Sequence, residues 1–296
     1  MDKFAIITDS CVDLDKDLRD RYDIDYVSMR YLYDDKDVPA SLDWEHLSYH
    51  DFYDLMRKGT RIKMAQVPSE EYFKKFSYYL EKGMDVLSLS CSSALSASYF
   101  AGEKVAEELR KRYPERKIYC VDSLSACMGL GIINLWASTL RAGGKKIDED
   151  YAEIEAHKLE VNQFATVADL NYLKRAGRVK AAAAFFGGIM QVKPIIISDA
   201  AGQNFAIEKV KGRKQSISRI IELFCQSYDR NAPFGEVFVS HADEPDTAEE
   251  MRAVLSEKLG ADVKISVGVI GPIVGASVGP GTVAVYGFGK KVTING

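Results

Sequence analysis

Short apolar runs alternate with longer segments of mixed polar and apolar residues through the first half of the chain. The apolar runs predict strands, and the mixed segments predict helices. The expected strands are residues 4–8, 26–33, 86–90 and 117–121, and the expected helices are residues 14–22, 44–58, 70–82, 92–113 and 124–140. Such alternation is typical of a parallel sheet covered by helices, with ligands bound at the carboxyl ends of its strands. Three of those ends carry small polar residues: Asp9-Ser10, Ser90 to Ser93, and Asp122-Ser123.

The pattern changes after Asp148. Two adjacent strands around a turn at Ala201-Gly202 indicate a mixed or antiparallel sheet. We therefore expect an α/β protein with an N-terminal three-layer domain, residues 1–160, whose sheet is mostly parallel, and a C-terminal two-layer α/β domain, residues 161–296, whose sheet is mixed or antiparallel. The second half is predicted to hold strands at 164–168, 194–198, 205–210, 236–240, 263–270 and 282–288, and helices at 150–161, 170–175, 181–191, 215–228 and 247–259.

Composition and charge narrow the function classes. Of the 296 residues, 47% are hydrophobic and 28% are charged, as in ordinary globular proteins. The formal net charge of −4 argues against a dominant nucleic-acid surface. Five cysteines without a C-x-x-C pair indicate reduced thiols. The apolar run at the N-terminus is too short for a signal peptide, and polar residues and glycines interrupt residues 181–197, so we expect a cytoplasmic protein without a membrane span.

The serine-rich segment Ser88–Ser98 is the most informative local feature. It places hydroxyl groups at the start of a predicted helix, where free N–H groups and the helix dipole favour a phosphate or a carboxylate. Alternatively, Ser92 or Ser93 only caps the helix. The residue types leave both interpretations open.

Other candidate motifs are weaker. The glycine-rich tail matches neither nucleotide-binding loop pattern and favours a tight turn, and the chain lacks a G-x-S-x-G motif. His46 and His50 could share a helix face with Asp43 or Asp54, but the spacing is not H-E-x-x-H, so no metal site is predicted. The basic segment 173–180 is either a docking patch or a solvated helix end.

Five stretches together resemble the DegV family of fatty-acid-binding proteins. Each stretch is weak alone, but their order and spacing are specific. They are Ile7–Leu14 (ITDSCVDL), Ser92–Tyr99, Val121-Asp122-Ser123, Asp169–Arg178 (DLNYLKRAGR) and Gly271–Gly281.

The resemblance implies a two-domain α/β protein that holds one long-chain fatty acid in an apolar tunnel between the domains. It implies the binding subunit of a bacterial fatty-acid kinase, which presents the carboxylate to a separate ATP-dependent kinase subunit. That subunit makes acyl phosphate for phospholipid synthesis. The chain itself is then a carrier and not an enzyme, with no cofactor, no metal, no nucleic-acid partner and no stable membrane insertion. Residues 181–190 and 72–79 could line the tunnel.

The resemblance also implies site residues. The family's carboxylate-binding serine corresponds to Ser96, and the amide that follows belongs to Ala97. Met64 stands where the family has a threonine, and Ala276-Ser277 where the family has alanine and histidine, so both positions depart from the family's donors. Arg175 and Arg178 lie in the part of the pattern associated with kinase docking. The alternative is an enzyme or regulator that acts on a small carboxylated or phosphorylated ligand at Ser90–Ser98.

Overall fold

The computed structural model describes residues 4–180 and 192–296. A four-stranded parallel sheet in the order β2-β1-β6-β7 forms the N-terminal half. Every residue of β1 and β6 is buried, as expected for parallel strands covered on both faces. The strands are β1 (Phe4–Asp9), β2 (Ile24–Val27), β6 (Asp85–Ser90) and β7 (Ile118–Asp122).

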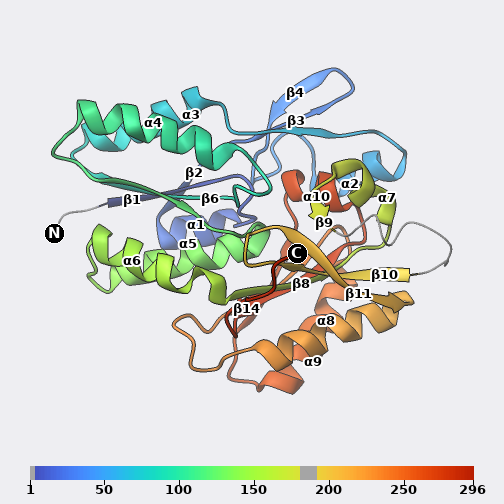
Figure 1. Ribbon diagram of the computed structural model, residues 1–296. Coiled ribbons are helices and arrows are strands. Elements are labelled where there is room, and N and C mark those ends of the chain that lie inside the picture. Colours follow the sequence, from blue (N-terminus) through green and yellow to red (C-terminus); the bar gives the residue numbers. More distant parts are fainter. Residues whose placement is uncertain (1–3, 181–191) are drawn as a thin grey trace.

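Helices cover both faces of this sheet and give the predicted three layers. In Figure 1, α3 (Ser69–Glu81) and α4 (Ser98–Arg112) lie on one side of the sheet. The other side carries α1 (Lys16–Tyr22), α5 (Cys127–Ala142) and α6 (Ile147–His157).

A seven-stranded mixed sheet in the order β13-β12-β14-β8-β10-β11-β9 forms the C-terminal half. Two of its strand pairs, β12–β13 and β9–β11, are parallel, and its other pairs are antiparallel. The helices α8 (Arg213–Ser227) and α9 (Pro245–Leu259) pack on this sheet. The α/β fold and the mixed second sheet are therefore confirmed. The strands are β8 (Val161–Thr166, after the 3-10 turn Lys158–Glu160), β9 (Val179–Lys180), β10 (Val192–Ser198), β11 (Asn204–Lys211), β12 (Val237–His241), β13 (Ile265–Val269) and β14 (Val283–Phe288).

Helix α5 joins the two halves. It contacts β1 and β6 of the first sheet as well as β8 and β14 of the second. Its residues from Cys127 to Ser138 are all buried, because a helix between two sheets has no face toward water. The Trp136 ring meets the Phe288 ring edge-on at 5.3 Å between centroids, which fixes the helix against β14.

The structure differs from the predicted elements in the segment that follows β2. The predicted strand 26–33 is two strands, β2 and β3 (Arg30–Tyr33). β3 pairs antiparallel with β4 (Lys36–Pro39) and β5 (Lys63–Ala65) in a small third sheet. The predicted helix 44–58 is shorter, α2 (Tyr49–Arg57), because the Ser48 side chain caps it by accepting the Asp51 N–H.

The glycine-rich tail is a helix and not the expected tight turn. α10 (Pro272–Val278) begins with proline at its first position and ends at Gly279, whose φ of 79° suits glycine. Inside the helix, a Cβ atom at Gly275 would stand 2.4 Å from the Tyr53 hydroxyl, so that glycine permits close packing of α10 on α2. The predicted helix 181–191 lies outside the described residues.

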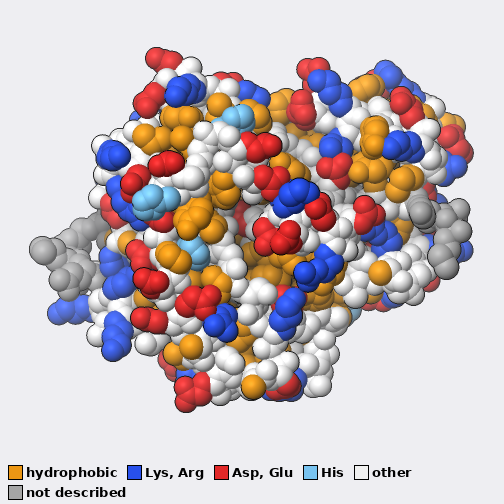
Figure 2. Space-filling model, turned by 180° about the vertical axis from the view of Figure 1, so that it is seen from behind, with side chains coloured by type: hydrophobic (Ala, Val, Ile, Leu, Met, Phe, Trp, Pro, Cys, Tyr) orange, Lys and Arg blue, Asp and Glu red, His pale blue; other side chains and the backbone are white. Residues whose placement is uncertain are grey.

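Within residues 4–180 and 192–296, no helix is both long enough and apolar enough to cross a membrane. On the face drawn in Figure 2, basic and acidic side chains are intermingled, and neither sign forms a continuous field.

Candidate functional site

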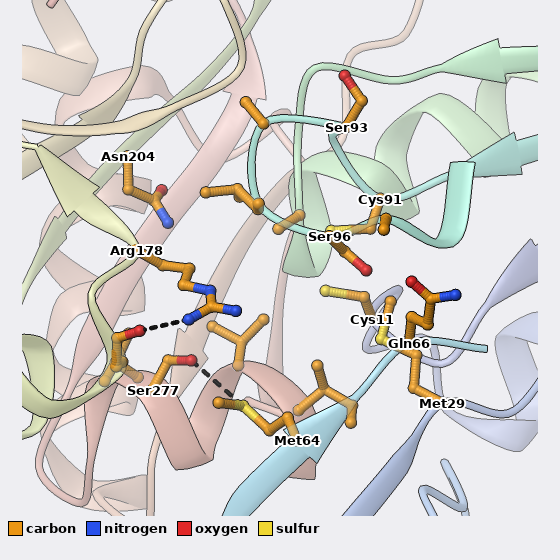
Figure 3. A pocket seen from close by; sticks show the side chains of 18 of the residues that line it. Cys11, Met29, Met64, Gln66, Cys91, Ser93, Ser96, Arg178, Asn204 and Ser277 are labelled. Carbon is orange, nitrogen blue, oxygen red and sulfur yellow. Dashed lines mark hydrogen bonds between the residues drawn. The ribbon is translucent and has the colours of Figure 1, made fainter. Parts of the chain in front are cut away.

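A cavity of about 380 Å³ lies between the two halves of the molecule. One wall comes from the ends of β1 and β6 and from β5, and the other from α10, β9 and the start of β11. Figure 3 shows this arrangement, with Ser96 and Cys11 facing Arg178 and Ser277. The lining residues are Cys11, Met29, Met64, Ala65, Gln66, Cys91, Ser93, Ala94, Leu95, Ser96, Ala97, Ala126, Ala176, Arg178, Val179, Asn204, Ile273, Val274, Ser277 and Val278.

Asp9 organises the strand ends beneath the cavity. Its carboxylate accepts the Cys11 N–H at 3.0 Å and the Cys91 N–H at 2.8 Å, so it ties the chain leaving β1 to the chain leaving β6. Burial raises the pKa of Asp9 to about 6, against the effect of these two hydrogen bonds. Asp9 is thus a structural carboxylate, and the sequence signal for it was its position at a strand end.

Sulfur atoms make the adjoining part of the cavity apolar. Cys11 and Cys91 are both buried, and the hydrogen bond with Cys11, together with burial, raises the pKa of the Cys91 thiol well above its ordinary value. Met29 and Met64 line the same space. Neutral thiols and thioethers behave as adaptable apolar surface, which suits a hydrocarbon better than a polar metabolite.

The anion site expected at the first serines of the 88–98 segment is occupied by the protein itself. The Asp122 carboxylate accepts the Ser93 N–H at 3.0 Å, and the Ser125 carbonyl accepts the Ser92 N–H at 2.8 Å. The chain turns over residues 92–96, and α4 begins only at Ser98. The prediction of a helix start at residue 92 was therefore wrong, because side-chain and loop acceptors hold these amides in a turn.

Ser96 and Ala97 stand at the real start of α4, on the cavity wall. The Ser96 oxygen accepts the Ser98 N–H at 3.2 Å and lies 3.0 Å from the Ser98 hydroxyl oxygen. That second hydroxyl accepts the N–H of Val67 at 3.1 Å. The Ala97 N–H has no hydrogen-bond partner within the described part of the chain, so it is an available donor beside Ser96.

Ser277 and Met64 meet across the cavity. The Ser277 hydroxyl donates to the Met64 sulfur at 3.3 Å, which links α10 to β5 (Figure 3). Ala276, by contrast, lines a neighbouring cavity of about 270 Å³. This second space, called the outer cavity below, shares Met64, Ala176 and Arg178 with the first.

The two arginines occupy different places. Arg178 lines both cavities, and Figure 3 shows its side chain extending between Asn204 and Ser277 into the first one. Arg175 lines the outer cavity, with its guanidinium 4.5 Å from the centroid of the Tyr172 ring. The sequence indicated a basic break here but not the inward direction of Arg178.

A smaller space of about 30 Å³ continues the first cavity toward the second sheet. The two share Val179, Asn204, Ala126, Val274 and Val278. Of the segments expected to line a tunnel, residues 181–190 lie outside the described residues. In residues 72–79, the large side chains of Tyr72 and Phe76 are buried in α3 packing instead.

His50 does not pair with His46, because His46 precedes α2. Instead, the His50 Nδ1 lies 3.1 Å from the Asp243 carboxylate, and its Nε2 lies 3.6 Å from Asp54. Arg57 also contacts Asp243, so cationic groups already neutralise the carboxylates of this cluster. The cluster is an ion-pair network that links α2 to the loop after β12.

The fold and this cavity define an α/β protein with a cavity between its two main sheets. A family model described as "Uncharacterised protein, DegV family" matches residues 3–289. A DegV domain-containing protein of Clostridium perfringens is 33% identical over 98% of this chain and 98% of its own length. The chain belongs to the DegV family.

Solved structures of related proteins agree with this assignment. A DegV family protein from Thermus thermophilus, described for its fatty acid binding, has a TM-score of 0.85 at 25% identity and covers 97% of this chain and 100% of its own. DegV from Bacillus subtilis, described as a fatty acid binding protein, has a TM-score of 0.82 at 25% identity, covering 98% and 100%.

Proposed function

We propose that this chain binds one long-chain fatty acid in the cavity between its two sheets. The observation that carries the proposal is the cavity itself, which has thiol, thioether and aliphatic surface together with a few polar groups on its two walls. Related structures described as fatty-acid-binding support it. A C16 acid has about 14 methylenes at about 0.8 kcal/mol each, so its burial contributes ~11 kcal/mol before ordering costs.

The carboxylate is proposed to lie against Ser96 and Ala97. The Ala97 N–H is without a partner among the described residues, and it stands at the start of α4, where the helix dipole favours a negative charge. The Ser96 hydroxyl is adjacent. Both groups face the cavity, so they can orient the head while the chain enters the apolar part.

We further propose that the bound acid is presented to a separate ATP-dependent kinase and that this chain performs no catalytic step itself. The outer cavity adjoins the proposed head-group position through Met64, Ala176 and Arg178. Arg175 on its wall is exposed and held over Tyr172, which suits contact with an acidic partner surface.

Mass spectrometry of an organic extract of the purified protein tests the lipid. We expect about one long-chain acid per chain. If the extract holds none, and added hexadecanoic acid does not raise the melting temperature, the carrier proposal fails.

Acyl-phosphate formation with a cognate kinase tests the partner. We expect Arg175→Glu to abolish product formation while hexadecanoic acid still binds with the parent's affinity. Arg252→Glu, a reversal at an exposed position on α9, is the control for net charge. Full product formation by Arg175→Glu would contradict this docking surface.

A further inference from the structure

Two buried cysteines, Cys11 and Cys91, are neighbours in the wall of the main cavity. A hydrogen bond joins their side chains, and Figure 3 shows them on the wall that faces Arg178. We infer that Cys11 and Cys91 are a redox-active pair, which a peroxide oxidises to a disulfide when the cavity holds no lipid. The disulfide is independent of the lipid, whereas its prevention by lipid rests on the proposed function.

The fold holds the two backbones at a separation that suits a disulfide. The Asp9 carboxylate accepts the Cys11 N–H at 3.0 Å and the Cys91 N–H at 2.8 Å. β1 and β6 are adjacent parallel strands in which Thr8 stands opposite Leu89, so the same register, continued, offsets Cys11 from Cys91 by one residue. With strands about 4.8 Å apart and a rise of about 3.3 Å per residue, this offset corresponds to about 6 Å between Cα atoms, and disulfides span roughly 4.4–6.8 Å.

The surroundings of the two sulfur atoms assign their roles. The Cys91 S–H donates to the Cys11 sulfur, which lowers the pKa of Cys11, and the Cys127 N–H donates to the same sulfur. Burial and the charges of Asp9 and Asp13 outweigh these bonds, so the pKa of Cys11 is raised. The pKa of Cys91 is raised well above its ordinary value, because its proton is held by Cys11 and because it is buried. Cys11 therefore forms a thiolate, the reactive species, more readily than Cys91.

The oxidation takes two steps with hydrogen peroxide as the oxidant. The Cys11 thiolate attacks one peroxide oxygen, the O–O bond breaks, and the leaving hydroxide takes up the proton that Cys11 released. The Cys91 sulfur then attacks the sulfur of the resulting sulfenic acid, so that the S–S bond forms and the S–O bond breaks. The expelled hydroxide takes the Cys91 proton. Two thiols thus lose two electrons and two protons, and one peroxide becomes two waters. The contact between the two side chains favours the second step.

The oxidant reaches the pair through the cavity. Cys11 and Cys91 are each only 2% exposed, and both line that space. A bound acyl chain occupies the same space against the same apolar wall. The empty protein is therefore open to oxidation and the loaded protein is protected, so the pair distinguishes one state of the carrier from the other.

Intact mass and peptide mapping after treatment with hydrogen peroxide test the pair on the delipidated full chain. We expect each chain to lose two hydrogen atoms and to give one cross-linked peptide pair that contains Cys11 and Cys91. Cys91→Ala should stop at the Cys11 sulfenic acid, which dimedone traps. Cys11→Ala should show neither a cross-link nor trapping at Cys91. Cys225→Ala is the matched control and should leave the cross-link intact, because Cys225 is half-buried on α8 and is not among the residues that line the cavity.

A second arm adds the lipid. Hexadecanoic acid at about a hundred times its Kd leaves about 1% of chains empty, so it should slow formation of the cross-link up to about a hundredfold. Equal rates with and without bound acid overturn the protection, while the carrier function stands. If the empty protein forms no Cys11–Cys91 cross-link, or pairs other cysteines, the redox pair is refuted and the carrier function again stands. If titration shows that the acid does not bind, the proposed function and the protection fail together, and the mapping of the empty protein alone decides on the pair.

Discussion

The hydroxyl oxygens of Ser96 and Ser98 lie 3.0 Å apart where α4 begins. Ser98 can supply the shared proton, because its oxygen already accepts the Val67 N–H at 3.1 Å while the Ser96 oxygen accepts the Ser98 N–H at 3.2 Å. Ser96 then keeps its own proton for a ligand. This pair fixes the orientation of the Ser96 hydroxyl before any ligand arrives, which lowers the ordering cost of binding.

Ser96→Ala should weaken binding of hexadecanoic acid by about 1.5–3 kcal/mol, the usual cost of losing a hydrogen bond to a charged group. The fold should survive, with a small loss of thermal stability, because the Ser98 N–H loses its acceptor. Titration of the acid and thermal melting measure the two effects separately. Ser256→Ala is the matched control, since Ser256 lies on α9 and is not among the residues that line the cavity. Equal affinities of parent and Ser96→Ala would place the head group elsewhere.

Sequence alone predicted most of the alternating strands and helices of the first half, because their patterns of apolar and polar residues are typical of strands and helices. Polar residues or glycines also mark where many of these elements end. The sequence missed β4 and β5 because strands of three or four residues, such as Lys63–Ala65, are too short to show a period. It also missed α10, since glycine has low helix propensity and only tertiary packing, as of Gly275 on Tyr53, explains its presence there.

Only part of the site could be predicted, because some of its features depend on contacts between segments that are distant in the sequence. The position of Ser96 follows from a local motif next to a helix. The direction of Arg178 depends instead on a pairing between Val179 and Asn204, 25 residues apart in the chain, which no local pattern reveals. The acceptor Asp122 likewise captures the Ser93 N–H from another strand end.

Asp150 gives a pH-dependent stability that can be measured. Its side chain is buried, neither carboxylate oxygen has a hydrogen-bond partner among the described residues, and burial raises its pKa from 3.8 to about 7. Between about pH 4 and pH 7 the folded state binds a proton that the unfolded state has released. The Asp150 contribution to stability is therefore present below about pH 4 and is lost as the pH rises to about 7.

Asp150→Asn removes this titration, because the amide is neutral at every pH. We expect the free energy of unfolding of the variant to exceed that of the parent by up to about 4 kcal/mol at pH 8. This difference should shrink as the pH falls toward 4. Urea unfolding at several pH values measures the difference. If the difference in unfolding free energy between variant and parent is the same at pH 4 and pH 8, Asp150 does not titrate as inferred.

His50 should titrate at a higher pH than an ordinary histidine. The hydrogen bond with Asp243 and the charges of Asp243 and Asp54 raise its pKa above 6.5. Its link between α2 and the loop after β12 is thus complete below pH 6.5 and is lost as the pH rises through the raised pKa. NMR titration of the ring protons should show a fall in this pKa in Asp243→Asn and a smaller fall in Asp54→Asn. A His50 pKa that Asp243→Asn leaves unchanged would contradict the network.

The contact between Ser277 and Met64 leads to a prediction about the head group. The Ser277 hydroxyl donates to a sulfur atom, a weak acceptor, at 3.3 Å. Replacing Met64 with threonine removes that acceptor and adds a hydroxyl donor on β5, where a β-branched residue is well suited. Met64→Thr should therefore tighten binding of hexadecanoic acid by about three- to tenfold, since one or two new donors outweigh the lost thioether contact. Ser277→His should also tighten it modestly, because the longer imidazole reaches further into the cavity.

Met64→Leu separates the two causes, because it conserves volume, removes the sulfur and adds no donor. If the released Ser277 hydroxyl turns to the carboxylate, Met64→Leu should give part of the affinity gain seen in Met64→Thr. The rest of that gain then comes from the threonine hydroxyl. Adding Ser277→Ala to each variant completes a double-mutant cycle. In the parent, Ser277→Ala should change acid affinity little, because that hydroxyl is committed to sulfur. In Met64→Leu the same substitution should cancel the gain. If the affinity for hexadecanoic acid is the same in the parent and in all of these variants, the head group does not lie between Ser96 and Ser277.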